Sequence, residues 1–166
     1  MTHLLAAAAL VLQISNFSSA PPVVVHQAQE EVTRVYAAIG VPLEWSEAAD
    51  RRPAIRIVLL PYETGDLRRS EKTVMGAALR TADGSAIAYV FHRRVQAEAE
   101  RYEVSTSQVL ACASAHELGH LLLPVRAHAP AGLMRACWSR DEFQRAEHGQ
   151  LQFLPEEVAR IRAALP

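Results

Sequence analysis

The sequence predicts a single α+β domain with a small mixed β-sheet, an N-terminal helix, a central buried helix and a C-terminal helical segment. Apolar runs of strand length occupy much of the first half, and helix-capping patterns recur in the second half. The 166 residues suffice for one hydrophobic core, and half of them are hydrophobic, as in ordinary globular proteins. A net charge of −1 gives no basic surface of the kind that nucleic-acid binding requires.

The N-terminal residues allow two interpretations. Leu4–Leu12 is apolar and alanine-rich, like the hydrophobic region of a signal peptide, and Ser18–Ala20 could serve as its cleavage site. Alternatively, residues 1–10 are a short or truncated leader, and Val11–Phe17 is a first strand with alternating apolar residues. We favour the second interpretation and expect a domain over residues 11–166, an extracytoplasmic location and no membrane span in the mature chain.

An early helix is predicted over His26–Ile39, where apolar residues recur at helical spacing and Gly40 follows as a C-terminal cap. The pair Asp83-Gly84 is typical of a β-hairpin turn. The remaining elements of this half are strands at Val41–Trp45, Ala54–Leu60, Thr73–Arg80 and Ala86–His92, and a short helix at Arg93–Tyr102.

Capping patterns mark the helices of the second half. Ser105 with Gln108 forms a capping box, so a helix begins at about Thr106, and it must end before Pro124. The same pattern at Ser139 and Glu142 opens a helix that reaches about His148, and Pro155 at a first helical position opens a last one to about Ala164.

The predicted central helix carries the pattern HELGH. Because residues four apart lie on one helical face, His116 and His120 can reach one metal ion. Glu117 lies beside the pair, where it can contact a metal-bound water without becoming a ligand. The alternative is two satisfied core histidines, but this leaves a carboxylate in an apolar helix without a structural purpose.

A catalytic zinc ion usually takes three protein ligands. The expected third ligand is His128, eight residues after the second histidine of the motif, and Glu142 or Glu147 are the alternatives. Met134 follows on a predicted turn, where its side chain can pack beneath the histidines as an apolar floor.

This combination of HELGH, a third histidine beyond a turn and a downstream methionine resembles the metzincin clan of zinc peptidases, with Met134 as the Met-turn. In metzincins the third histidine follows the second by six positions, whereas the step here is eight, and Leu123 stands at their glycine position. The spacing is also similar to that of short exported zincin-like proteins of soil bacteria, which carry glycine at Pro124 and serine at Ala129. The resemblance implies a zincin-like fold, one zinc ion, and a cleft bordered by strand Thr73–Arg80 that pairs with an extended substrate.

These features predict a monomeric zinc-dependent hydrolase that cleaves peptide bonds in a peptide or protein substrate. Zinc on the three histidines would activate a water molecule and polarise the scissile carbonyl, with Glu117 as the general base. Tyr89 and Tyr102 are candidate donors by residue type alone. Two alternatives remain, namely a catalytically silent zincin-fold binding module and a zinc hydrolase of non-peptide amides or esters.

Two further residue types are open to more than one interpretation. Cys112 and Cys137 flank the proposed metal ligands, and an exported protein could bridge them, although two separate thiols are equally compatible with the spacing. His92 ends a predicted strand, where it could approach the cleft, but it is expected at the surface.

Overall fold

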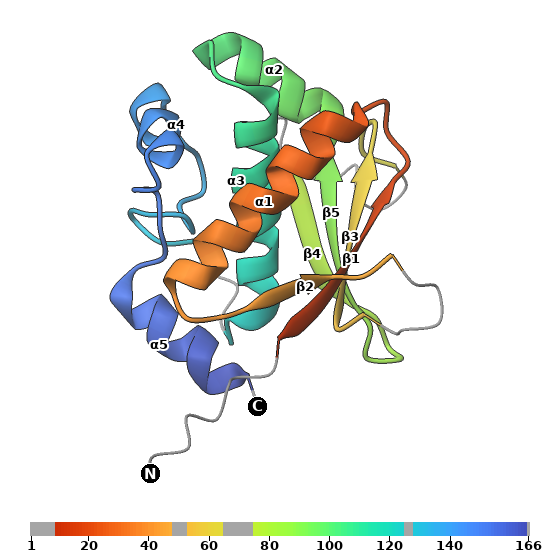
Figure 1. Cartoon of the computed structure of the whole chain (residues 1–166), viewed down its shortest axis with the longest axis vertical. Coiled ribbons are helices and arrows are strands. Elements are labelled where there is room, and N and C mark those ends of the chain that lie inside the picture. Colours follow the sequence, from red (N-terminus) through yellow and green to blue (C-terminus); the bar gives the residue numbers. More distant parts are fainter. Residues whose placement is uncertain (1–8, 48–52, 65–74, 125–127, 166) are drawn as a thin grey trace.

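The computed structural model describes residues 9–47, 53–64, 75–124 and 128–165, which form a mixed α/β fold with a five-stranded sheet and five helices (Figure 1). The elements in chain order are β1 (Leu10–Asn16), α1 (Pro22–Ala38), β2 (Leu43–Trp45), β3 (Ile55–Leu60), β4 (Gly76–Arg80), β5 (Ala86–Phe91), α2 (His92–Tyr102), α3 (Thr106–Leu122), α4 (Arg140–Glu147) and α5 (Pro155–Ala164).

The sheet has the strand order β2-β1-β3-β5-β4. Strands β2, β1, β3 and β5 run parallel, whereas β4 forms one edge of the sheet and pairs antiparallel with β5. The hairpin predicted at Asp83-Gly84 is confirmed, since Gly76 pairs with Val90 and Arg80 with Ala86 across it. The predicted mixed sheet is therefore present, with its antiparallel strand at the edge.

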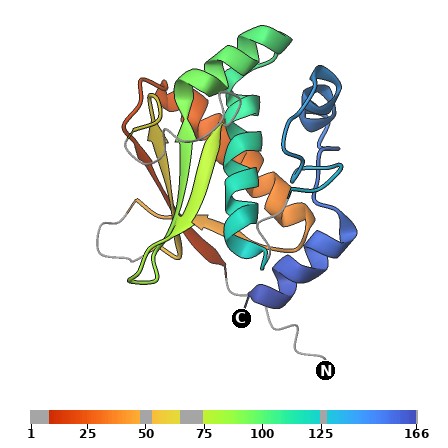
Figure 2. The same cartoon turned by 180° about the vertical axis from the view of Figure 1, so that it is seen from behind.

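Helix α3 lies at the centre of the molecule, with the sheet on one side and α4 and α5 on the other (Figures 1 and 2). It contacts α1, α2, α4 and α5 as well as strands β4 and β5. Most of its residues are buried, which agrees with an apolar composition on nearly all of its faces. Both predicted ends are confirmed: the Ser105 hydroxyl accepts a hydrogen bond from the Gln108 amide (3.0 Å), and the helix stops before Pro124.

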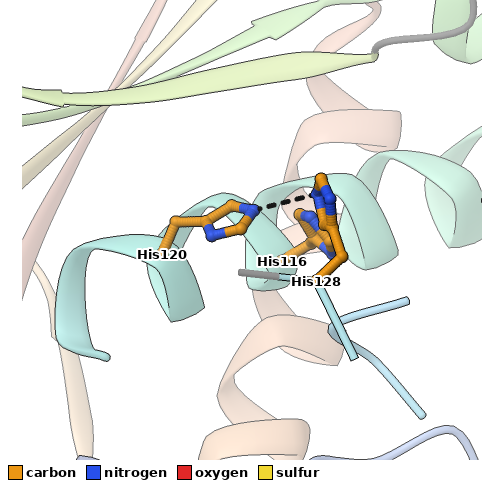
Figure 3. A group of neighbouring side chains, drawn as sticks. All are labelled: His116, His120 and His128. Atoms are coloured by element: carbon orange, nitrogen blue, oxygen red, sulfur yellow. Dashed lines mark hydrogen bonds between the residues drawn. The ribbon is translucent and has the colours of Figure 1, made fainter. Parts of the chain in front are cut away.

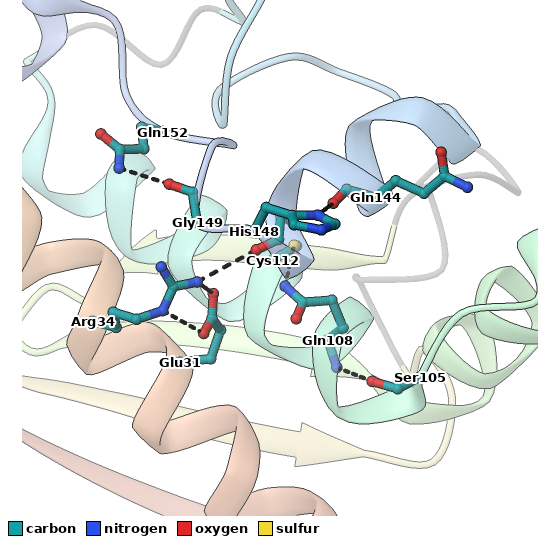
Figure 4. A network of polar contacts seen from close by, with 10 residues as sticks. Glu31, Arg34, Ser105, Gln108, Cys112, Gln144, His148, Gly149 and Gln152 are labelled. Atoms are coloured by element: carbon teal, nitrogen blue, oxygen red, sulfur yellow. Dashed lines mark hydrogen bonds and ion pairs between the residues drawn. The ribbon is translucent and has the colours of Figure 1, made fainter.

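Two expectations about helix α1 have different outcomes. The helix begins at Pro22, four residues before the predicted start at His26, because proline suits a first helical turn and Val25 extends the buried face by one turn. Gly40 has φ of +73° and follows the helix end as predicted. Arg34 of this helix donates to the Ala146 carbonyl (3.3 Å), which ties α1 to α4 (Figure 4).

The other boundaries differ from the predictions by small amounts. The first strand covers Leu10–Asn16, close to the predicted Val11–Phe17, and the helix predicted from Arg93 begins at His92. Residues 1–8, most of the predicted leader, and the start of the predicted strand at Thr73 lie outside the described residues. None of the helices in the described ranges is long and apolar enough to cross a membrane.

A buried hydrogen bond joins α1 to the central helix. The Tyr36 ring is fully buried, and its hydroxyl donates to the Ala115 carbonyl (3.0 Å), next to the HELGH pattern. We expect Tyr36→Phe to lower the free energy of unfolding by about 1 kcal/mol, because one buried hydrogen bond is lost without a change of shape. Urea unfolding measures this, and Tyr62→Phe, at a half-exposed tyrosine, is the matched control. Equal effects of the two substitutions would contradict the prediction.

Candidate metal centre

Three histidine side chains meet at the surface of α3 (Figure 3). His116 and His120 project from the helix, and His128 comes from the segment that follows it. One ring nitrogen from each residue lies within 4.8 Å of the other two. The structure thus brings together the three residues that the sequence predicts as metal ligands.

The spacing of these nitrogens can be compared with zinc coordination. Two nitrogens that each lie about 2.05 Å from one ion at the tetrahedral angle are separated by about 3.3 Å. The Nε2 atoms of His120 and His128 are 3.3 Å apart. The chemistry of the donor set also fits, because three neutral imidazoles are a known ligand set of catalytic zinc sites.

A backbone carbonyl fixes the orientation of the most buried of the three imidazoles. The Nδ1 atom of His116 lies 2.9 Å from the Leu133 carbonyl oxygen, and since a carbonyl can only accept, Nδ1 carries the proton. The deprotonated Nε2 atom is then available to a metal ion. Burial lowers the pKa of His116 to about 3, so the ring stays neutral, as a metal ligand must.

The segment around Met134 packs against the helix that carries two of the histidines. Met134 is fully buried, and its Sδ atom would lie 2.5 Å from a Cβ placed on Gly119, the glycine of HELGH. The glycine therefore lets the methionine approach the helix between the two histidines of the motif. The contact with Gly119 places Met134 against the helix that carries two of the histidines, and its role as an apolar floor stays a prediction.

The same segment holds the chain beside the third histidine. The Ala129 amide donates to the Met134 carbonyl (2.8 Å), and the Leu133 amide donates to the Gln152 carbonyl (2.9 Å). Residues 133 and 134 thus bond to the His116 ring, to the residue after His128 and to the chain before α5. Residues 125–127 lie outside the described chain.

Glu117 is buried beside the histidine group but is not a member of it. Glu117 and all three histidines line one pocket of about 290 Å³. Burial raises the pKa of Glu117 to about 8. A divalent cation on the histidines would oppose this rise, because a nearby positive charge favours the carboxylate form.

Met75 and the first residues of edge strand β4, Gly76, Ala77 and Ala78, also line this pocket. A Cβ on Gly76 would lie 2.6 Å from Cγ of Glu117, 2.7 Å from its Oε1 and 2.7 Å from the Tyr89 carbonyl. A larger residue at position 76 of the strand would clash with the Glu117 carboxylate, so glycine fits there. Gly76 and Gly119 were not identified from the sequence, although a glycine within a strand or helix indicates a close approach.

Several other candidates lie elsewhere. Glu142 is buried at the start of α4, where its Oε2 accepts from the backbone amide and hydroxyl of Ser139, and Glu147 is exposed. Neither carboxylate belongs to the histidine group. Tyr89 and Tyr102 are not among the described residues that line the pocket. The expectation that His92 is exposed is wrong, because only 1% of its surface is accessible at the start of α2.

The two cysteines are free thiols in the structure. Cys112 is buried in α3, where Gln108 Nε2 lies 3.7 Å from its sulfur (Figure 4). Cys137 is exposed. Of the two alternatives for this pair, the structure contains separate thiols and no bridge. Gln108 thus contacts Cys112 through its side chain, while its backbone amide bonds to Ser105.

Neither a model of any known protein family nor any curated protein sequence matches the chain.

The contact between Gly76 and Glu117 can be tested through stability. Gly76→Ala should lower the free energy of unfolding by about 1–3 kcal/mol, because the added methyl group overpacks the pocket wall. In a Glu117→Ala background the cost should be smaller, since two of the three nearest atoms, Cγ and Oε1 of Glu117, are then absent, while the Tyr89 carbonyl stays. Urea unfolding of the four proteins in this cycle measures the coupling. Additive costs would show that Glu117 does not limit the size of residue 76.

The thiol assignment can be tested with a thiol reagent such as DTNB. We expect one reactive thiol per native chain, at exposed Cys137, and two after unfolding. Cys112 should be silent in the native protein because burial raises its pKa to about 12 and blocks access. Cys137→Ser should remove the native signal. A native chain that reacts only after reduction would contain the bridge.

Proposed function

We propose that the protein is a zinc-dependent hydrolase that cleaves peptide bonds. The observation that carries this proposal is the convergence of three imidazole nitrogens beside a buried, non-ligating carboxylate in one pocket. Three protein ligands leave a coordination position open for water or substrate, whereas structural zinc sites are closed by four. A site that only stores or binds metal has no use for the adjacent carboxylate of Glu117.

His116, His120 and His128 would hold the ion. When bound, a zinc ion would supply Lewis acidity and lower the pKa of a water molecule at the open position to about 7. Glu117 then accepts the proton of the attacking water and returns it to the leaving amine. The Leu133 carbonyl keeps the proton of His116 on Nδ1 throughout, and Met134 is fully buried beside Gly119 of the motif.

The zincin-like character of the fold is part of the same proposal. It is supported by a HELGH helix packed on a mixed sheet, and by an antiparallel edge strand that lines the pocket. An extended peptide could pair with the outer edge of β4 and so lie across the histidines. The metzincin-like assignment, the similarity to short exported zincin-like proteins and an extracytoplasmic location belong to this proposal.

Two rival functions lead to different measurements. A silent zincin-fold binding module would bind zinc and a partner without turnover. A hydrolase of non-peptide amides or esters would turn over small acyl substrates but no peptide. A peptide library and a set of small esters and amides, each assayed with and without chelator, distinguish the three functions.

The roles of the ligands and of Glu117 can be separated by substitution. Glu117→Gln should retain one zinc per chain and lose hydrolysis by at least about a hundredfold, because the general base is removed and the ligands remain. His128→Ala should lower zinc affinity, because one of three ligands is lost. Metal content by mass spectrometry and peptide turnover are the measurements.

His26→Ala is the matched control, since His26 is exposed on α1 far from the histidine group in sequence. It should change neither zinc content nor turnover. Turnover that survives Glu117→Gln would remove Glu117 from the mechanism. Zinc affinity that survives His128→Ala would remove His128 from the ligand set.

A further inference from the structure

A positively charged arginine side chain lies in the wall of the proposed active-site pocket. Arg135 lines the pocket together with the three histidines and Glu117. Besides the histidines, Glu117 and Arg135 are the only ionisable residues among the described residues that line this pocket. A metal ion on the histidines would add further positive charge, so the occupied pocket would attract anionic groups.

A buried carboxylate holds the guanidinium group of Arg135 in place. Its Nη1 atom donates to Oε1 of Glu142 (2.7 Å), whose side chain is only 3% exposed. The other oxygen of this carboxylate accepts from the backbone and side chain of Ser139. Glu142 is thus fixed as the cap of α4 and in turn fixes one edge of the guanidinium group.

The rest of the guanidinium group remains available. Within the described chain, Arg135 makes no side-chain hydrogen bond other than the one to Glu142, and its side chain is 46% exposed. An arginine has five N–H donors in a planar fork that suits a carboxylate. One edge of the fork is anchored, and the remaining donors can bind a ligand.

The neighbouring wall indicates the shape of that ligand. Ala113 and Ala136 have small side chains that leave room, and Trp138 adds an apolar indole surface. An occupant with a short aliphatic stem and a terminal carboxylate matches both features. A glutamate side chain has this form, and a substrate with a C-terminal carboxylate shares its charge.

We propose that Arg135 is a specificity-determining residue that binds a carboxylate of the substrate, so that the pocket selects peptides with a glutamate side chain near the scissile bond. This inference rests on the proposed peptidase function and adds a substrate class to it. The site assigned to the carboxylate is the part of the Arg135 guanidinium that Glu142 does not occupy.

The test uses the zinc-loaded full chain and alanine-based peptides blocked at both ends. One set carries a single glutamate at successive positions, and a matched set carries glutamine. At one position we expect kcat/KM for glutamate to exceed that for glutamine by about tenfold, the effect of one charge-assisted hydrogen bond in a half-exposed setting. The ratio should fall to about one in Arg135→Gln. Because both values come from the same variant, the ratio does not depend on its folded fraction.

Arg145→Gln is the matched control. Arg145 also lies near Glu142 (3.8 Å) and is 53% exposed, but it is not among the described residues of the pocket wall. It should keep the preference for glutamate. A third peptide set, unblocked at the C-terminus and without glutamate, shows whether a terminal carboxylate is the preferred source of the charge, which would overturn the assignment to a side chain.

A binding measurement separates this inference from the proposed function. The Kd values of the same peptides, labelled with a fluorophore, are measured by anisotropy on zinc-loaded Glu117→Gln with and without Arg135→Gln. A glutamate preference that needs Arg135 supports the inference, even if no peptide is hydrolysed and the proposed function fails. A missing preference, one that survives Arg135→Gln, or a uniform loss of kcat for both peptide sets would overturn it.

Discussion

The hydrogen bond between the His116 ring and the Leu133 carbonyl is the contact on which the geometry of the site depends. It sets the tautomer and angle of the most buried imidazole, and it binds the central helix to the segment that carries Met134. Through the Ala129 amide and the Met134 carbonyl, this segment also holds the chain next to His128. One short stretch of backbone therefore positions a histidine on the helix and a histidine beyond it.

The site also depends on how closely secondary-structure elements can approach each other. Gly119 admits the Met134 side chain on one side of the helix, and Gly76 admits the Glu117 carboxylate on the other. These two glycines therefore allow the helix that carries Glu117, the proposed general base, to lie close to β4 on one side and to Met134 on the other. A helix with the same motif but larger residues at these contacts would hold its histidines and carboxylate farther from the sheet and from the supporting segment.

Much of the fold follows from local sequence patterns. The start of α3 at Ser105, the hairpin at Asp83-Gly84 and the opening of α5 at Pro155 depend on residues within a few positions of one another, so they were predictable. The histidine group was predictable because two of its members share a helix face. The approach of Gly76 to Glu117 depends on strand order and on the packing of the sheet against α3, which no local pattern encodes. The capping pattern alone would predict that the Gln108 side chain bonds to the backbone of Ser105. In the structure its Nε2 atom contacts the sulfur of Cys112 instead.

The placement of His128 outside the central helix has a thermodynamic consequence. An ion held by His116, His120 and His128 would act as a reversible cross-link between α3 and the following segment. The closed loop is short, so the loss of loop entropy in the unfolded chain contributes little, and the stabilisation would come mainly from the affinity itself. Folding would then be linked to the free metal concentration, with a melting temperature that rises with the logarithm of that concentration. The stability of the chain would in this way report the metal supply of its surroundings.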